Sequence, residues 1–290
     1  MFDGSSVAIV TPFKNGRVDE RALGDLIEFQ IAQGTDGIVP CGTSGESATL
    51  TYEEHDRVIE CAVEAVRHRV PVIAGTGSNS TDEAIVLTKH AKTAGADGAL
   101  LICPYYNKPT QEGLYRHYKT IAEAVDLPLV LYNIPSRTSV NMLPSTVARL
   151  SAIRNIVAIK EGAGSLQQVS EIIEACGERI TVLSGDDALT LPMMAVGGKG
   201  VITVTANVAP ADMAALVDAF AAGHLDRAKT LHYKLYPLFT ALFYETNPIP
   251  VKEALAMMGK IDPELRLPLC PMSSENRDKL TRVMKDYGLI

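Results

Sequence analysis

The chain has 290 residues, of which 47% are hydrophobic and 21% are charged, a composition typical of globular proteins with an extensive core. Its net charge of -7 and the lack of a block rich in lysine and arginine argue against nucleic acid as a partner. No apolar run approaches the length of a membrane span, and the first residues lack the basic start and long apolar stretch of a signal peptide.

Eight short apolar runs recur along the chain, and each is followed by polar residues and then by a stretch of helical pattern. We expect strands at 7–10, 37–39, 70–74, 98–102, 127–131, 156–159, 180–183 and 201–204. We expect helices at 19–33, 53–68, 81–94, 111–125, 143–151, 165–176, 188–196 and 210–222. Strict alternation indicates an α/β fold with a parallel sheet, and eight units predict a (β/α)8 TIM barrel. The competing arrangement, an open doubly wound sheet, usually has fewer strands, and the dinucleotide-binding turn is missing here.

The alternation stops after about residue 223. Helical patterns follow at 225–243, 251–259 and 274–286. We therefore predict a catalytic barrel over residues 1–224 and a small helical domain over residues 225–290. Two helix starts have the spacing of a capping box, one from Thr51 to Glu54 and one from Ser80 to Glu83.

Cysteine and histidine usage gives no sign of a metal or a disulfide framework. The five cysteines are odd in number and widely spaced, and none forms a C-x-x-C motif. This favours reduced thiols and a cytoplasmic location. The six histidines form no metal-binding pattern, so we expect no catalytic metal.

Active sites of such barrels lie at the carboxyl ends of the strands. The residues expected there are Thr11, 41–46, 75–79, 104–107, Tyr132, Arg137, Lys160, 184–187 and 203–207. Hydroxyls and glycines dominate this set, which has one lysine and one arginine and neither a cluster of carboxylates nor a histidine. Such a set suits covalent chemistry at an amine, with hydroxyl groups relaying protons.

Lys160 stands at the tip of the buried run 156–159. Burial disfavours the charged ammonium form, and a neutral amine is a nucleophile for a ketone. The alternative is a lysine that extends from the strand end into solvent. Tyr132 lies one strand away and has the hydroxyl needed to relay protons to an imine, although a tyrosine packed in the core is the alternative.

Three further features leave two interpretations open. The turn at 42–45 either cradles a carboxylate with its backbone N–H groups or has only a structural role. Arg137 either binds a carboxylate or is a solvated surface residue. Tyr105 and Tyr106 either take part in catalysis or pack at a subunit contact.

Taken together, several motifs resemble the dihydrodipicolinate synthase family, also called 4-hydroxy-tetrahydrodipicolinate synthases, within the pyruvate-dependent class I aldolase and N-acetylneuraminate lyase superfamily. The motifs lie at 42–47, 105–109, 132–138, 159–161, 184–187 and 200–203. The resemblance runs from about residue 4 to past Lys252. It implies condensation of pyruvate with L-aspartate-4-semialdehyde, the first committed step of the diaminopimelate and lysine pathway, without a metal or organic cofactor.

The resemblance also implies roles for the catalytic residues. Lys160 would form the Schiff base, and Tyr132 would relay protons. Thr43 would link Tyr132 to Tyr106, which in the family reaches in from a neighbouring subunit. A dimer would then be the minimal active unit, and the usual assembly would be a homotetramer built as a dimer of dimers.

The substrate-binding residues follow from the same resemblance. Thr43 and Ser44 would hold the carboxylate of pyruvate, and Arg137 that of the semialdehyde. Gly185 and Ile202 would add backbone contacts near the imine. Ser44 stands where the family often has threonine, which keeps the hydroxyl.

A second hypothesis is an allosteric site for L-lysine, because feedback-inhibited relatives bind lysine at a subunit interface. The corresponding residues are Ser47, Ala48, His55, Asn79, Glu83 and Tyr105. Tyr52 departs from the histidine of enteric members. Ordinary interface residues are the alternative.

Two other functions compete with the condensation. A sibling lyase, such as N-acetylneuraminate lyase or a keto-sugar-acid aldolase, shares the lysine–tyrosine pair, but Arg137 favours a carboxylate over a sugar. A barrel that only binds a metabolite is the second alternative, and the complete set of Thr43, Tyr106, Tyr132 and Lys160 argues against it.

Overall fold

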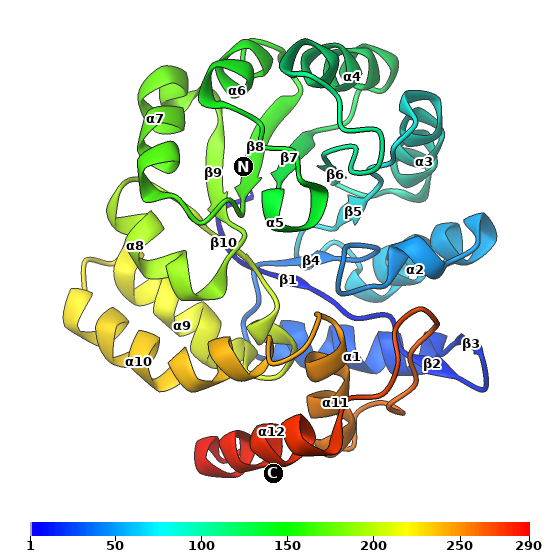
Figure 1. Ribbon diagram of the computed structural model, residues 1–290, viewed down its shortest axis with the longest axis vertical. Coiled ribbons are helices and arrows are strands. Elements are labelled where there is room, and N and C mark those ends of the chain that lie inside the picture. Colours follow the sequence, from blue (N-terminus) through cyan, green and yellow to red (C-terminus); the bar gives the residue numbers. More distant parts are fainter. Residues whose placement is uncertain (1) are drawn as a thin grey trace.

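The computed structural model describes residues 2–290. Its central feature is a nearly closed barrel of eight parallel strands with helices around the outside (Figure 1), as predicted. In chain order the barrel strands are β1 (Gly4–Ala8), β4 (Gly37–Val39), β5 (Ile73–Gly75), β6 (Gly98–Ile102), β7 (Leu129–Asn133), β8 (Ile156–Glu161), β9 (Thr181–Ser184) and β10 (Gly200–Thr203).

The outer layer contains the eight predicted helices. They are α1 (Glu20–Ala32), α2 (Tyr52–Val66), α3 (Thr81–Ala94), α4 (Gln111–Ala124), α6 (Pro144–Leu150), α7 (Leu166–Cys176), α8 (Thr190–Ala195) and α9 (Pro210–Ala221). Short elements that the prediction missed are the hairpin β2 (Phe13–Lys14) and β3 (Arg17–Val18), helix α5 (Pro135–Thr138), and the 3-10 turns η1 (Ser47–Thr49), η2 (Gly177–Arg179), η3 (Asp187–Leu189) and η4 (Thr205–Asn207).

Three helices follow the barrel, namely α10 (Leu225–Ala241), α11 (Ile249–Met257) and α12 (Ser274–Tyr287). They lie together beside α1 and α9 (Figure 1). Leu235, Leu255 and Leu280 from these helices share one buried cluster with Val7 of β1 and Leu23 of α1. The carboxyl-terminal helices therefore complete a core that begins in the barrel, while the proposed boundary after residue 224 coincides with the start of α10.

The barrel closes between β4 and β5, the two ends of the hydrogen-bonded strand order. A single parallel bridge pairs Ile38 with Val72 there. The N–H of Ile38 donates to the Pro71 carbonyl at 3.0 Å, and the N–H of Gly75 donates to the Pro40 carbonyl at 2.9 Å. A Cβ atom on residue 75 would lie 2.2 Å from the Cys41 carbonyl oxygen, so this close approach requires glycine.

Strand alternation decides which side chains face the lumen. Val130 and Tyr132 of β7 pack with Ala158 of β8 in the lumen cluster, whereas Leu131 and Ile159 pack against the surrounding helices. Lys160 has the same parity as Ala158 and is paired in register with Tyr132. The lysine side chain therefore enters the lumen from the carboxyl end of β8.

Some predicted boundaries were wrong by a few residues. The strand expected at 127–131 is observed at 129–133, so Tyr132 lies inside the strand and not after it. The strand expected at 7–10 begins at Gly4, because the buried Ser5 and Ser6 pair with β10 although they are polar. An apolar run cannot reveal such a strand.

The two predicted capping boxes differ in outcome. Thr51 and Glu54 form the full reciprocal box at the start of α2. Ser80 caps α3 by accepting from the Glu83 N–H, but the Glu83 carboxylate turns instead to the hydroxyls of Ser78 and Tyr52. The Glu83 carboxylate therefore lines a cavity and does not close the capping box.

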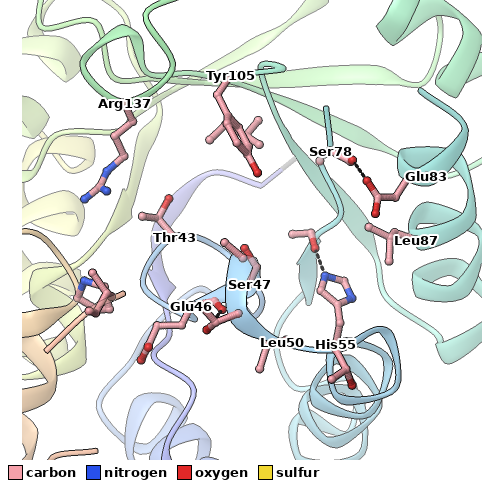
Figure 2. Close-up of a pocket in the computed structure, with 18 of the residues that line it drawn as sticks. Thr43, Glu46, Ser47, Leu50, His55, Ser78, Glu83, Leu87, Tyr105 and Arg137 are labelled. Atoms are coloured by element: carbon pink, nitrogen blue, oxygen red, sulfur yellow. Dashed lines mark hydrogen bonds between the residues drawn. The ribbon is translucent and has the colours of Figure 1, made fainter. Parts of the chain in front are cut away.

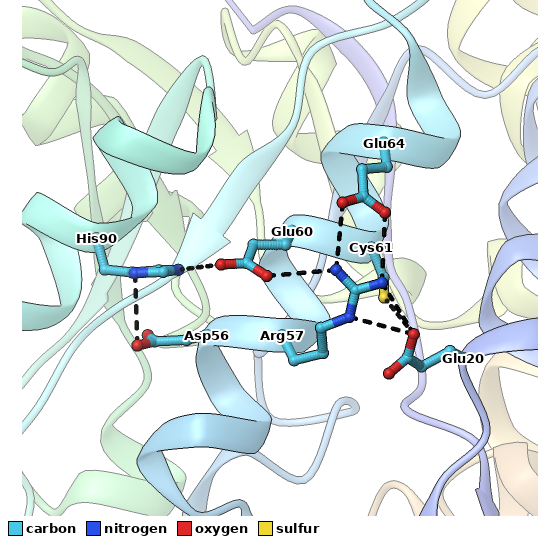
Figure 3. A network of polar contacts seen from close by, with 7 residues as sticks. All are labelled: Glu20, Asp56, Arg57, Glu60, Cys61, Glu64 and His90. Carbon is cyan, nitrogen blue, oxygen red and sulfur yellow. Dashed lines mark hydrogen bonds and ion pairs between the residues drawn. The ribbon is translucent and has the colours of Figure 1, made fainter.

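A network of charged side chains joins the first three outer helices (Figure 3). Arg57 of α2 contacts Glu20 of α1 at 2.9 Å and Glu60 at 3.3 Å, while His90 of α3 lies between Asp56 and Glu60. These side chains are partly exposed, so each pair contributes about 0–1 kcal/mol. The network fixes α2, which follows the turn that contains Thr43.

Candidate active site

Lys160 and Tyr132 meet at the carboxyl end of the barrel lumen. Lys160 Nζ lies 4.3 Å from the centroid of the Tyr132 ring, and each residue is only 5% exposed. An amine that is sheltered from water beside a phenol is suited to attack on a carbonyl group, with the phenol as proton carrier. The structure thus brings together the two residues that the sequence placed at the centre of catalysis.

Glu161 follows Lys160 but lies on the opposite face of β8. Its carboxylate accepts from Asn133 Nδ2 at 3.0 Å, from the Ala163 N–H at 2.6 Å and from Gln168 Nε2 at 3.2 Å. Burial raises the pKa of this carboxyl group. No sequence motif assigned a role to Glu161, although the alternation of the strand indicates that its side chain points away from the lumen.

The turn after β4 contains Thr43 and Ser44. It is closed by a hydrogen bond from the Gly45 N–H to the Gly42 carbonyl at 3.1 Å and another from the Glu46 N–H to the Thr43 carbonyl at 3.2 Å. Ser44 is buried, and its Oγ accepts from Asn247 Nδ2 at 3.1 Å. Thr43 lines a cavity at the barrel mouth, so the turn presents the Thr43 side chain to that cavity.

A buried ion pair attaches the end of this turn to helix α11. Lys252 Nζ of α11 lies 2.6 Å from Glu46 Oε1, and both side chains are 1% exposed. Burial lowers the pKa of Lys252, and the charge of Glu46 partly offsets that effect. The Arg266 N–H also donates to Glu46, at 3.2 Å. This pair could not be predicted from the sequence, because the two residues are 206 positions apart and no local pattern links them.

Two cavities flank the barrel mouth. The first, of about 660 Å³, is lined by Thr43, Ser47, Tyr105 and Arg137 among others (Figure 2). The second, of about 620 Å³, is lined by Arg137 and Gly185 among others. Arg137 belongs to both cavities, and its Nη2 donates to the Asn247 carbonyl at 3.1 Å. Its guanidinium group is therefore held in place at the mouth, where an anion can reach it.

Gly185 directly follows β9, and Ile202 belongs to the neighbouring strand β10. Ile202 is buried in the same lumen cluster as Tyr132. The Gly185 N–H donates to the Glu161 carbonyl at 2.7 Å, and a Cβ atom at position 185 would come within 3.1 Å of that oxygen. The backbone at residue 185 therefore lies directly beside the end of β8 that carries Lys160.

Tyr105 and Tyr106 stand on the loop after β6. Asn79 Oδ1 accepts from the N–H of Tyr105 at 2.7 Å and from the N–H of Tyr106 at 3.2 Å. Tyr105 lines the first cavity, whereas the Tyr106 side chain is 87% exposed. Within one chain Tyr106 is therefore directed away from the lumen.

The residues of the predicted lysine site meet in the first cavity, with one exception. Its lining includes Ser47, Ala48, His55, Glu83 and Tyr105, while Asn79 holds the loop at 105–106. Hydrogen bonds from Ser78 and Tyr52 lower the pKa of Glu83. Burial lowers the pKa of His55, whose Nε2 lies 2.9 Å from the Gly75 carbonyl (Figure 2). The carboxylate of Glu83 is thus one of the charged groups that line this cavity.

Residues 2–290 contain no group of three histidine, cysteine or carboxylate side chains that could hold a metal ion. In the same range, no helix is long and apolar enough to cross a membrane. All five cysteines are free, and only Cys270 is exposed.

Comparisons with known proteins identify the family of this chain. The model of the dihydrodipicolinate synthetase family matches residues 1–287. A 4-hydroxy-tetrahydrodipicolinate synthase from Syntrophus aciditrophicus is 66% identical over 290 residues, which is all of both chains.

Two solved structures are also similar over nearly the whole chain. The dihydrodipicolinate synthase of Acinetobacter baumannii complexed with pyruvate has a TM-score of 0.98 and 50% identity, and the match covers all of both chains. The enzyme of Cyanidioschyzon merolae with lysine bound has a TM-score of 0.96 and 41% identity, and the match covers 100% of this chain and 99% of that one. This chain therefore belongs to the dihydrodipicolinate synthetase family.

Proposed function

We propose that this protein condenses pyruvate with L-aspartate-4-semialdehyde to give 4-hydroxy-tetrahydrodipicolinate, through a Schiff base on Lys160. The observation that carries the proposal is the sheltered Lys160 amine, 4.3 Å from the Tyr132 ring centroid at the end of the lumen. The names of the curated relative and of the pyruvate complex support the same chemistry.

In the first stage, neutral Lys160 Nζ attacks the ketone carbon of pyruvate. The ketone oxygen gains two protons and leaves as water, which gives a protonated imine. Tyr132 is the proton carrier, because its ring lies beside Nζ. The protonated imine then withdraws electrons from the methyl carbon, so loss of a methyl proton gives an enamine.

In the second stage, the enamine carbon attacks the aldehyde carbon of the semialdehyde, and the aldehyde oxygen takes a proton to become a hydroxyl. The amine of the bound semialdehyde then displaces Lys160 from the imine carbon and closes a six-membered ring. Lys160 returns to its free form, and the whole cycle releases one water molecule.

The two substrate carboxylates have different partners in this proposal. Thr43 and Ser44 bind that of pyruvate, supported by the hydroxyl-bearing turn at the lumen mouth. Arg137 binds that of the semialdehyde, supported by its place in both cavities. Gly185 and Ile202 contribute backbone groups near the imine. Gly185 supports this because it directly follows β9, which pairs with β8, and Ile202 because it lies on β10, the next strand after β9.

The proposal includes a homo-oligomer, built as a dimer of dimers, that works in the cytoplasm. The highly exposed Tyr106 supports a subunit contact, through which it would reach the Thr43 and Tyr132 of a neighbouring chain. The five free cysteines fit a reducing compartment.

A second proposal concerns regulation by L-lysine at the residues Ser47, Ala48, His55, Asn79, Glu83 and Tyr105. The lysine-bound relative supports it, as does the carboxylate of Glu83 in the first cavity. A carboxylate beside hydroxyl groups is a suitable partner for an ammonium group.

The direct test of the main proposal is reductive trapping. The protein is incubated with pyruvate and borohydride, and the modified residue is mapped by mass spectrometry. Labelling at Lys160 is expected, and an unlabelled Lys160 would contradict the proposal. Turnover of semialdehyde, compared with N-acetylmannosamine, then distinguishes the condensation from the sibling lyases.

A further inference from the structure

Asn247 joins the two halves of the proposed active site. It lies between α10 and α11, is only 5% exposed, and belongs to both cavities at the barrel mouth. Its Nδ2 donates to Ser44 Oγ at 3.1 Å, and its backbone carbonyl accepts from Arg137 Nη2 at 3.1 Å. One residue thus contacts both groups assigned here to the substrate carboxylates.

The two contacts use different parts of Asn247. Only the side chain reaches Ser44, and only the backbone reaches Arg137. A side-chain substitution should therefore remove the contact with Ser44 and leave the contact with Arg137 in place.

The direction of the bond to Ser44 determines what the serine can do. A hydroxyl group has one hydrogen to donate. Because Asn247 Nδ2 donates to Ser44 Oγ, the hydrogen of Ser44 is not used by this bond and remains available to an anion. The Oδ1 atom of Asn247 is buried without a hydrogen-bond partner among the described residues.

We propose that Asn247 is a positioning residue that turns the hydroxyl hydrogen of Ser44 toward the carboxylate of the 2-oxo acid substrate. This inference rests on the proposed function, because it requires pyruvate to bind at Ser44. Asn247 acts through Ser44 and does not itself need to touch the substrate.

The test compares the KM of each substrate in four variants. Asn247→Ala should raise the KM of pyruvate about 3- to 10-fold, the equivalent of one ordinary hydrogen bond, and change that of the semialdehyde less than about 2-fold. Asn247→Asp should be worse for pyruvate, because a carboxylate would draw the Ser44 hydrogen to itself and repel the anion. Ser44→Ala should behave like Asn247→Ala, and the double variant should be no worse than Ser44→Ala alone.

Several results would overturn the inference. They are an equal rise in both KM values, additive effects in the double variant, or an Asn247→Asp variant that binds pyruvate as well as Asn247→Ala. If Asn247→Ala does not fold, as judged by circular dichroism, the Ser44→Ala and Ser44→Ala/Asn247→Asp pair tests the same coupling. In the Ser44→Ala background the Asp substitution should raise the KM of pyruvate less than it does in the parent, because no serine hydrogen is left to draw away, and an equal rise in both backgrounds would count against the idea.

Borohydride trapping separates this inference from the proposed function. If the parent protein is not labelled at Lys160, the proposed function itself fails. If the parent is labelled, and the pyruvate concentration for half-maximal labelling is the same in the parent and in Asn247→Ala, only the role of Asn247 fails.

Discussion

Lys252 and Glu46 form a fully buried ion pair, 2.6 Å between Nζ and Oε1, although they are 206 residues apart in the chain. Glu46 ends the turn that contains Thr43 and Ser44, and Lys252 belongs to α11. The pair therefore fixes the turn at 42–45 to the carboxyl-terminal helices. Because removal of one partner leaves the other charge buried and unpaired, the pair is sensitive to single substitutions.

Lys252→Met should lower the free energy of unfolding by about 3–5 kcal/mol, since the Glu46 carboxylate would lose its counter-ion. Urea denaturation measures the effect. The double variant Lys252→Met/Glu46→Gln should recover most of the loss. Lys14→Met is the matched control, because the Lys14–Asp262 pair is largely exposed and should matter by only about 0–1 kcal/mol. A single variant as stable as the parent would show that the pair has no such role.

Tyr132→Phe should lower kcat by about 10²- to 10⁴-fold, because the ring stays packed in the lumen but the proton carrier is lost. Steady-state kinetics measures the fall, and thermal denaturation checks that the fold is retained. Borohydride should still label Lys160, more slowly. Unchanged turnover would remove Tyr132 from the mechanism.

Arg137→Ala should raise the KM of the semialdehyde by about 10- to 150-fold, the range expected for a hydrogen bond to a charged group. Pyruvate binding should change little, because Arg137 is assigned to the other carboxylate. Arg137→Lys should be intermediate, as lysine keeps the charge but not the fork of two donors. Similar losses for the two substrates would favour a sibling lyase.

Glu161 should make the protein less stable as the pH rises. Burial raises the pKa of its carboxyl above the ordinary value of 4.5, so the folded state holds this proton more tightly than the unfolded state does. The free energy of unfolding therefore falls as the pH rises from about 4.5 through the raised pKa, and then levels off.

Glu161→Gln removes that titration, so its stability relative to the parent should increase with pH across the same window. Urea denaturation at a series of pH values measures the difference. Glu174→Gln, at an exposed position of α7, is the control for a simple loss of charge. A parallel pH profile for Glu161→Gln and the parent would exclude the effect.

L-lysine should bind in the first cavity and inhibit turnover, with Glu83 as the partner of an ammonium group. Isothermal titration calorimetry and inhibition assays measure both effects. Glu83→Gln should weaken inhibition without changing the KM of pyruvate. Neither heat nor inhibition at millimolar L-lysine would reject the site.

The sequence predicted those features that repeat at short range. Each strand of the barrel and the place of Lys160 followed from an apolar run of a few residues, and Thr51 and Glu54 formed the box that their spacing indicated. Where a strand contains polar residues, as at Ser5 and Ser6, the apolar pattern is lost and the predicted start was wrong.

Contacts between segments that are distant in the chain could not be predicted from local sequence patterns. Glu46 with Lys252 and Ser44 with Asn247 are formed only when the helices after the barrel pack against its first units. The direction of the Glu83 side chain could not be predicted either. Its carboxylate accepts from the hydroxyls of Tyr52 and Ser78, which lie outside α3, and not from the backbone N–H of Ser80. The sequence therefore predicts the candidate catalytic residues more fully than the long-range contacts that hold them in position.

The barrel seam between β4 and β5 also follows from two prolines. Pro40 and Pro71 have no N–H to donate, so each can offer only its carbonyl to the facing strand. No small shift of register can complete the ladder there, so the seam between β4 and β5 depends on few hydrogen bonds. Since Pro40 comes just before the turn at 42–45, opening of this seam should displace that turn, while Lys160 on β8, which pairs with neither β4 nor β5, should keep its position.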